Sequence, residues 1–358
     1  MFDSVKTDGH EQVLFGFDPV SGLRTIIAIH STALGPALGG TRFFPYASEE
    51  DALFDVVRLS KGMTYKAAAA GLDLGGGKAV IIGDPKTASS ERFLRAYGRI
   101  VDSLQGRYIT AEDVGTTATD MEMIRRETRW ALGTPIAEGG SGDPSPMTAV
   151  GLFAAIEAVA ERLWKDADVR GRRFAVQGVG KVGRPFVELL VKAGAEVVVA
   201  DTYEPAAAAA ADEYGVKMVG PDEILAVDCD ILAPCAMGAV FDDTTIPTLS
   251  CAAIAGSANN QLLEDRHAED LAKRGILYAP DFVVNAGGLI NVAEEIRGYE
   301  RSRALHRVEE LRAATVAVFE EADRLGVEPQ KAATAKAERR LKEIGDLRRF
   351  RRSGTDRN

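Results

Sequence analysis

A lysine that follows three glycines is the first residue here whose setting suggests chemistry. Lys78 closes the run GLDLGGGK and precedes the apolar run Ala-Val-Ile-Ile. A phosphate-binding P-loop would need glycine at Leu72, serine or threonine at Ala79, and a helix after the lysine. Because Leu72 and Ala79 are apolar and the β-branched run predicts a buried strand, we exclude that class of phosphate site. An isolated GGGK is more often a glycine turn with a surface lysine.

Lys66 and Asp113 lie near the ends of other predicted elements and could act together with Lys78. A lysine kept away from water can polarise a carbonyl and exchange protons with a water molecule. A second cation could fix a substrate carboxylate, and an acid could hold an amine and shuttle its proton. Together these groups suit oxidation of a 2-amino acid followed by hydrolysis of the imino acid. Spacing alone does not show that the three residues converge.

A dinucleotide fingerprint opens the second half of the chain, with the residues Gly178, Val179, Gly180, Lys181, Val182 and Gly183. This GxGxxG lies between a predicted strand, FAVQ, and a predicted helix, and the next strand, EVVVAD, ends in Asp201. The glycines would allow a tight turn, the close approach of a pyrophosphate, and packing of the helix on the strand. The alternative interpretation is that they serve only the packing of helix on strand. Asp201 would bind the ribose 2′-hydroxyl and repel a 2′-phosphate, which predicts NAD rather than NADP as cofactor.

The elements that must position these residues follow from the periodicity of the apolar residues. Alternating runs at 13–18 and 24–30, joined by a turn, predict a hairpin. Ser48, with Asp51 three residues later, opens a helix that runs to about residue 70 and carries Lys66. The remaining expected elements are a strand at 79–82, a helix at 90–104, a strand at 108–110, a helix at 119–126, a glycine- and proline-rich break at 139–146, a helix to 164, strands within 229–234, 251–258 and 276–288, and mostly helix from 302.

The composition limits the classes of function. With 358 residues, 46% hydrophobic and 27% charged, the chain has the size of a two-domain globular protein. The net charge of −10 argues against nucleic-acid binding, and the basic tail from Arg339 indicates a solvated face or an oligomer contact. The sequence has neither a secretory signal nor an apolar run of membrane-spanning length, so we expect no membrane partner. Three unpaired cysteines and four scattered histidines predict a cytoplasmic protein without disulfides or metal.

Eight stretches resemble the glutamate/leucine/phenylalanine/valine dehydrogenase family, and most closely its leucine dehydrogenases. They are, in order, LGPALGGTR (34–42), LSKGMTYKAAAAGLDLGGGKAVIIGDP (59–85), GRYITAEDVGTT (106–117), GSGDPSPMTA (140–149), AVQGVGKVG (175–183), CDILAPCAMGA (229–239), IAGSANNQLLEDRH (254–267) and GILYAPDFVVNAGGLINVAEE (275–295). The resemblance implies an α/β fold with an N-terminal substrate domain and a Rossmann-like NAD-binding domain, separated by a cleft. We divide the chain into 1–145 plus 330–358, and 146–329. A homo-oligomer is implied, often an octamer, although relatives form dimers and tetramers.

The resemblance also implies a role for each matching residue. Lys78 would activate the hydrolytic water and stabilise the carbinolamine, and Asp113 would take the proton of the amino group. Lys66 and the backbone N–H of Gly40 would bind the substrate carboxylate. The other implied contacts are Asn260 with nicotinamide and substrate, Asn285 with nicotinamide, and Thr148 with the glycine turn around the cofactor. On this reading GGGK is a rigid glycine turn that presents Lys78.

The implied reaction is the reversible, NAD-dependent oxidative deamination of leucine, valine and isoleucine to 2-oxo acids and ammonia. Leu38 stands where glutamate dehydrogenases have a lysine, which predicts an apolar substrate side chain; Ala111, Leu289 and Val292 would complete the pocket. Leu289 departs from the usual valine and would narrow the pocket towards valine or 2-aminobutyrate, whereas phenylalanine ranks lower. A non-catalytic NAD sensor is the alternative, but it should have lost Lys66, Lys78 or Asp113.

Overall fold

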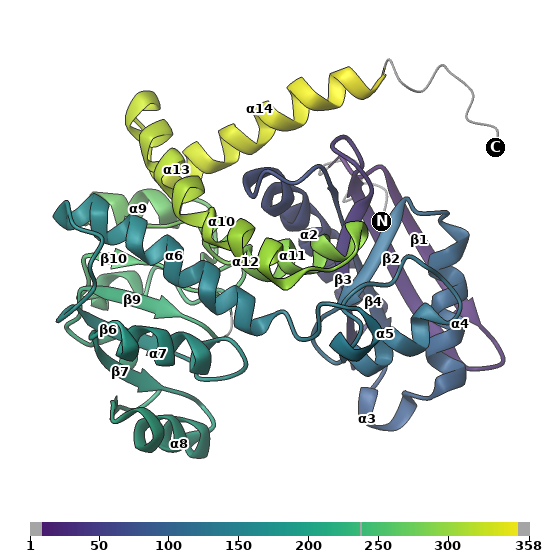
Figure 1. Ribbon diagram of the computed structural model, residues 1–358, viewed down its shortest axis with the longest axis horizontal. Helices are drawn as coiled ribbons and strands as arrows, with labels where there is room; N and C mark the ends of the chain where they lie inside the picture. The colour runs from purple at the N-terminus through teal and green to yellow at the C-terminus, as the bar shows by residue number, and fades with distance from the viewer. Residues whose placement is uncertain (1–8, 237, 350–358) are drawn as a thin grey trace. The chain divides into compact units, whose positions relative to one another are not determined.

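The computed structural model describes residues 9–236 and 238–349, which form two compact α/β units (Figure 1). Unit 1 comprises the chain up to Asp143, Asn291–Arg301, and the chain from Ala337; unit 2 comprises Pro144–Ile290 and Ser302–Lys336. The predicted fold class of two α/β domains is confirmed. Within the described ranges, no helix combines the length and apolarity needed to cross a membrane. The end of the basic tail, beyond Arg349, lies outside the described residues.

Unit 1 is built on a mixed five-stranded sheet. Its strands are β1 (Gln12–Asp18), β2 (Leu23–Ser31), β3 (Ala37–Phe44), β4 (Gly75–Ile82) and β5 (Tyr108–Glu112), and they lie in the order β1-β2-β4-β3-β5. The hairpin β1–β2 is antiparallel, as predicted, and β2 is antiparallel to β4. β3 is parallel to both β4 and β5. The three parallel strands therefore place their carboxyl ends along one edge.

Helices cover both faces of this sheet. They are α2 (Glu49–Ala69), α3 (Pro85–Ala88), α4 (Glu91–Ser103) and α5 (Ala118–Arg125), with the 3₁₀ turns η1 (Ile136–Glu138) and η4 (Glu294–Arg297). The predicted start of α2 is confirmed, because the Ser48 side chain accepts the backbone N–H of Asp51. α2 packs Val56 and Val57 onto Val80 of β4, whereas α4 and α5 pack in a separate core with Ala79 and Ile81. Alternate residues of β4 thus face different helices.

The glycine triplet is not a turn, and that prediction was wrong. Gly75, Gly76 and Gly77 lie inside β4, where their neighbours leave no room for a side chain. A Cβ on Gly75 would lie 1.9 Å from the carbonyl oxygen of Ser31, and one on Gly77 would lie 2.7 Å from the ring of Tyr108. Close packing, rather than a positive φ angle, explains these glycines. Lys78 therefore projects from a strand.

Unit 2 is a doubly wound parallel sheet. Its strands are β6 (Arg173–Gln177), β7 (Glu196–Ala200), β8 (Lys217–Met218), β9 (Ile231–Pro234), β10 (Ala253–Ile254) and β11 (Leu277–Tyr278), in the order β11-β10-β9-β6-β7-β8. All the pairings are parallel. The order reverses between β6 and β9, and ligands of such sheets bind beyond the carboxyl ends of the strands at this point. The glycine fingerprint follows β6.

The helices of this part of the chain are α6 (Ser145–Trp164), α7 (Gly183–Lys192), α8 (Glu204–Tyr214), α9 (His267–Lys273), α10 (Asp281–Val284), α11 (Gly287–Ala293), α12 (Arg301–Glu309), α13 (Leu311–Leu325) and α14 (Pro329–Arg349), with η2 (Ile224–Ala226) and η3 (Ile246–Thr248). α14 begins in unit 2, but its residues from Ala337 belong to unit 1. Phe174 of β6 and Phe186 of α7 lie in the same buried core, together with residues of α6 and α13. This packing fixes the start of α7 beside β6.

Candidate active site

Three adjacent strands of unit 1 bring the sequence-predicted residues onto one face of the sheet. Leu38 is paired with Gly76, and Gly40 is paired with Ala111. Because side chains alternate along a strand, this face carries Leu38, Gly40, Arg42, Gly76, Lys78, Ala111 and Asp113, the residue after β5. α2 covers the same face, since Gly76 lies against Thr64. Lys66 is the second residue after Thr64 on that helix.

Lys78 and Asp113 form a close ion pair. The ammonium nitrogen of Lys78 lies 2.6 Å from Oδ2 of Asp113, and the two side chains are 7% and 22% exposed. The backbone N–H of Asp113 donates to Oγ1 of Thr116, which in turn donates to the carbonyl oxygen of Thr41 on β3. The turn after β5 is thereby tied to the neighbouring strand. The carboxylate is held in place from both the side chain and the backbone.

A second cation binds the same carboxylate, and sequence reasoning missed it. Nε of Arg42 lies 3.3 Å from Oδ2 of Asp113, and its Nη1 lies 2.8 Å from Oδ2 of Asp55. Arg42 ends the stretch LGPALGGTR that carries part of the family resemblance. The signal available in the sequence was its position two residues after Gly40, because side chains two residues apart on a strand face the same side of the sheet. That signal could not be used, because β3 itself was not predicted.

The charges around Asp113 determine its protonation. Burial by itself would raise the pKa of this carboxyl, but the positive charges of Lys78 and Arg42 outweigh burial and lower the pKa to about 2. Asp113 is therefore a carboxylate near neutral pH. Such a group can accept a hydrogen bond from an amine and take up a proton when the balance of charge beside it changes.

The neighbouring residues on this face are closely packed and partly apolar. A Cβ on Gly40 would lie 2.5 Å from the carbonyl oxygen of Glu112 and 2.8 Å from Cβ of Asp113, so only glycine fits there. Leu38 and Ala111 are 1% and 6% exposed. The face therefore combines two cations, one carboxylate and buried aliphatic carbon.

In unit 2, the local structure requires two of the three fingerprint glycines and leaves the third facing open space. Gly178 has a φ of +94°, which favours glycine strongly. A Cβ on Gly183 would lie 1.9 Å from the carbonyl oxygen of Gly178, so helix α7 starts in direct contact with the turn. Gly180 faces open space, with no described atom within 4 Å of its ideal Cβ. Within the described chain, no side chain caps α7, so its N-terminal N–H groups can meet a phosphate.

Asp201 organises this turn from the end of β7. Its Oδ2 accepts the backbone N–H of Val179 at 2.9 Å, and its Oδ1 accepts that of Tyr203 at 2.8 Å. Each carboxylate oxygen can accept more than one hydrogen bond, so both oxygens retain capacity for ribose hydroxyls. The turn, the start of α7 and Asp201 together fit a dinucleotide.

Asn285 presents an acceptor that the described residues leave unused. Its Nδ2 donates to the carbonyl oxygen of Ser257 at 3.2 Å and to Oδ1 of Asn259 at 3.0 Å. Its Oδ1 is buried and has no hydrogen-bond partner in the described chain. An orphaned acceptor of this kind suits a donor such as a carboxamide NH₂. Asn285 therefore fits the nicotinamide role that the resemblance implies for it.

Four of the predicted site residues remain to be placed: Asn260, Thr148, Leu289 and Val292. Asn260 adopts a left-handed backbone conformation with a φ of 52°, and its carbonyl oxygen accepts the N–H of Ala239. Thr148, in the first turns of α6, has its Oγ1 2.6 Å from the ideal Cβ position of Gly288. Leu289 follows in α11, and Val292, 4% exposed, belongs to the segment of unit 1. The contact of α6 with α11 thus places Thr148 beside Gly288, the residue before Leu289.

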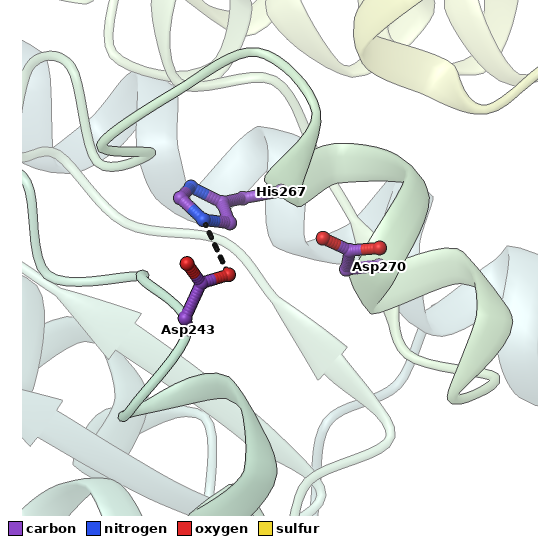
Figure 2. Close-up of side chains that lie close together, drawn as sticks. All are labelled: Asp243, His267 and Asp270. Carbon is purple, nitrogen blue, oxygen red and sulfur yellow. Dashed lines mark hydrogen bonds and ion pairs between the residues drawn. The ribbon is translucent and has the colours of Figure 1, made fainter.

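A further cluster of acidic and histidine side chains does not resemble a metal centre. Asp243, His267 and Asp270 have potential ligand atoms within 4.8 Å of one another (Figure 2). Both carboxylates are already bound, since Asp243 receives two 2.7 Å hydrogen bonds from Arg266 and Asp270 receives one of 2.8 Å from Lys273. A backbone N–H donates to Nδ1 of His267, so Nε2 carries the proton of the neutral ring. We interpret the cluster as an ion-pair network at the start of α9.

Comparison with known proteins places this geometry in a family. The sequence model for the Glu/Leu/Phe/Val dehydrogenase dimerisation domain matches residues 10–130, and that for Glutamate/Leucine/Phenylalanine/Valine dehydrogenase matches 139–206 and 200–346. The chain is 50% identical over 341 residues to leucine dehydrogenase from Thermoactinomyces intermedius, covering 95% of this chain and 93% of that one. It is 51% identical over 336 residues to valine dehydrogenase from Streptomyces virginiae, covering 93% and 94%.

A solved structure agrees with this assignment. L-tryptophan dehydrogenase from Nostoc punctiforme superposes with a TM-score of 0.81 at 44% identity, covering 96% of this chain and 99% of that chain. The match thus extends over both units. The chain therefore belongs to the Glu/Leu/Phe/Val dehydrogenase family and is a pyridine-nucleotide-dependent amino-acid dehydrogenase.

Proposed function

We propose that this enzyme catalyses the reversible, NAD-dependent oxidative deamination of leucine, valine and isoleucine to 2-oxo acids and ammonia. The observation that carries the proposal is the Lys78–Asp113 pair, 2.6 Å apart, on a sheet face that also holds buried Leu38. A lysine and a carboxylate in contact can divide the proton transfers of amine oxidation and imine hydrolysis. The leucine and valine dehydrogenases among the relatives support the same reaction.

Each residue of unit 1 has a defined task in this proposal. Lys66 and the backbone N–H of Gly40 bind the substrate carboxylate, and Asp113 takes a proton from the substrate ammonium. Bound NAD would supply the acceptor for the hydride that leaves Cα. Lys78 then holds the water that attacks the imine carbon and stabilises the carbinolamine, which collapses to 2-oxo acid and ammonia with a proton transfer through Asp113.

The choice of side chain follows from Leu38. A glutamate side chain would place its carboxylate in this apolar surrounding without a partner at position 38, which is costly. Leu38 and Ala111 instead offer buried carbon for an aliphatic side chain. We therefore propose branched-chain amino acids as the substrates and do not expect glutamate to be one.

A preference for valine is the second candidate. Leu289 carries one methylene more than the valine usual in leucine dehydrogenases, and a valine dehydrogenase is 51% identical to this chain. A hydrophobic pocket discriminates one methylene by about 1–3 kcal/mol, so overlapping activity on all three substrates is expected. An aromatic preference ranks lower, and the tryptophan dehydrogenase neighbour makes aromatic amino acids a required part of the test.

NAD, rather than NADP, is the proposed cofactor because the Asp201 carboxylate lies beside the glycine turn. A homo-oligomer, such as an octamer, is proposed because the outer strand β1 exposes 52% of Phe15 and 66% of Phe17. This strand lies in the region that matches the dimerisation-domain model.

We also propose a cytoplasmic location, which the three free cysteines support.

Product analysis tests the proposal. Leucine, valine, isoleucine, glutamate, phenylalanine and tryptophan are each incubated with NAD or NADP, and 2-oxo acid, ammonium and reduced cofactor are quantified. Equimolar products from the three branched-chain substrates with NAD support the proposal. Turnover confined to glutamate or to the aromatic amino acids overturns the substrate assignment, and a preference for NADP overturns the cofactor assignment.

A further inference from the structure

The carboxylate of Asp113 has two cations on the same oxygen. Lys78 Nζ lies 2.6 Å and Arg42 Nε lies 3.3 Å from Oδ2 of Asp113. In the proposed reaction Lys78 exchanges protons, so its charge changes during turnover. The guanidinium of Arg42 stays protonated at any pH at which the enzyme is folded. The charge of Lys78 therefore changes as the reaction proceeds, whereas the charge of Arg42 stays constant.

Arg42 is itself fixed by a second carboxylate. Its Nη1 lies 2.8 Å from Oδ2 of Asp55 on α2, and the hydroxyl of Tyr46 donates to the same oxygen at 2.6 Å. The Arg42 side chain thus joins β3, α2 and the turn after β5. The side chains of Arg42 and Asp55 are 24% and 18% exposed, so solvent screens these charges only in part. This degree of burial distinguishes the network from the exposed ion pairs on the surface of the unit.

The charges of the network balance only while both cations are present. Asp113 and Asp55 supply two negative charges, and Lys78 and Arg42 supply two positive charges. If Lys78 becomes neutral, Asp113 keeps one permanent cation at hydrogen-bond distance. Without Arg42, the same step would leave a partly buried carboxylate with no cationic partner in this network, which favours uptake of a proton.

We propose that Arg42 is a positioning residue that keeps Asp113 ionised and oriented while Lys78 is neutral, and that Asp55 and Tyr46 hold Arg42 in place. The catalytic consequence rests on the proposed function, whereas the electrostatic claim does not. The charged and titratable groups facing Asp113 in this network are Lys78 from β4, Arg42 from β3 and, through Arg42, Asp55 of α2 and Tyr46. Both ion pairs join their cation to Oδ2 of Asp113.

An infrared titration tests the electrostatic claim without requiring activity. Lys78→Met mimics loss of the lysine charge, and the C=O band of a protonated carboxyl is followed from pH 8 to pH 4. Subtracting the spectrum of the variant that also carries Asp113→Asn isolates Asp113. In Lys78→Met we expect Asp113 to stay ionised throughout most of this range. In Lys78→Met with Arg42→Gln we expect its protonation midpoint to rise by about 1–3 pH units.

Two further variants separate charge from structure. Arg42→Lys keeps the positive charge. In the Lys78→Met variant we expect it to give Asp113 a lower protonation midpoint than Arg42→Gln does. Arg24→Gln is the matched control, because Arg24 pairs with Glu49 of the same helix α2 in an exposed position; it should leave the titration unchanged. If circular dichroism shows that Arg42→Gln does not fold, Arg42→Met replaces it. An equal midpoint in the presence and absence of Arg42 overturns the proposal.

Kinetics tests the catalytic consequence. For Arg42→Gln we expect kcat with leucine or valine to fall about 10²-fold or more, and the acid limb of the kcat/KM profile to move to higher pH. The KM for the amino acid should change less than kcat, and Arg24→Gln should match the unmodified enzyme. An unshifted pH profile with a lowered kcat would indicate a merely structural role and overturn the proposal. If the unmodified enzyme oxidises no amino acid, the proposed function fails, while the infrared titration still decides the role of Arg42.

Discussion

Gly76 of β4 packs directly against Thr64 of α2. A Cβ on Gly76 would lie 2.1 Å from the backbone nitrogen of Thr64 and 2.2 Å from its Oγ1. The helix that carries Lys66 therefore rests on the backbone of the strand that carries Lys78. This contact fixes the spacing between α2 and β4 at this point.

Gly76→Ala should consequently destabilise the protein. The added methyl group meets backbone atoms that cannot move independently, so we expect the free energy of unfolding to fall by about 1–3 kcal/mol or more. Gly62→Ala, on helix α2, is the matched control, because the ideal Cβ of Gly62 has no described neighbour within 4 Å. That variant should gain about 0.5–1 kcal/mol from better helix propensity. Urea denaturation measures both, and equal stability of the two variants would contradict the packing argument.

The lowered pKa of Asp113 makes part of the stability depend on pH. Its folded pKa of about 2 lies below the ordinary value of 3.8, so the ionised group stabilises the fold fully above pH 3.8 and loses this effect as the pH falls towards 2. The stability difference between the unmodified protein and Asp113→Asn should thus be constant near neutral pH and shrink in acid. Denaturant titrations from pH 6 to pH 2 would show this. A difference independent of pH would mean that Lys78 and Arg42 do not stabilise the carboxylate.

Cofactor selection should respond to the charge of Asp201. Asp201→Asn keeps an acceptor for the N–H of Val179 but removes the repulsion of a 2′-phosphate. We expect the ratio of kcat/KM for NAD over NADP to fall about tenfold, the equivalent of about 1.4 kcal/mol. Glu196→Gln, at the exposed opposite end of β7, is the control and should leave the ratio unchanged. An unaltered ratio in Asp201→Asn would remove this carboxylate from the cofactor site.

The preference among branched-chain substrates should respond to Leu289. Leu289→Val removes one methylene, and we expect the kcat/KM of leucine relative to valine to rise about tenfold or more. Leu263→Val removes the same group from a side chain that is 54% exposed, and it should not change the ratio. Competition between the two substrates in one assay gives the ratio directly. If both variants behave alike, Leu289 does not line the substrate pocket.

The sequence was sufficient for elements whose signals are local. The Ser48 cap and the apolar spacing of residues 52–57 predicted α2, and the strand–glycine–helix pattern at 173–192 predicted the fold of unit 2. These signals depend on neighbouring residues, so they can be read without knowledge of tertiary contacts. The family resemblance added residue roles, which remain predictions.

Features that depend on distant contacts could not be predicted. β3 was missed because its two glycines break the alternation of apolar and polar residues expected of a strand. The glycine triplet of β4 was taken for a turn, since its real cause is the close approach of Ser31, Thr64 and Tyr108 from other elements. Arg42 was overlooked because its partner Asp113 is 71 residues away in the chain. All three misses lie in the neighbouring strands β3 and β4.

The most direct test of the central claim compares the unmodified enzyme with Lys78→Ala and with Lys86→Ala, an exposed lysine of the same unit. NADH formation at about 340 nm is followed with leucine, valine and isoleucine, and NADH consumption is followed with the corresponding 2-oxo acids and ammonium. We expect Lys86→Ala to match the unmodified enzyme and Lys78→Ala to lose at least about 10²-fold in both directions. Turnover by Lys78→Ala at the unmodified rate would contradict the assignment of Lys78 as the catalytic lysine.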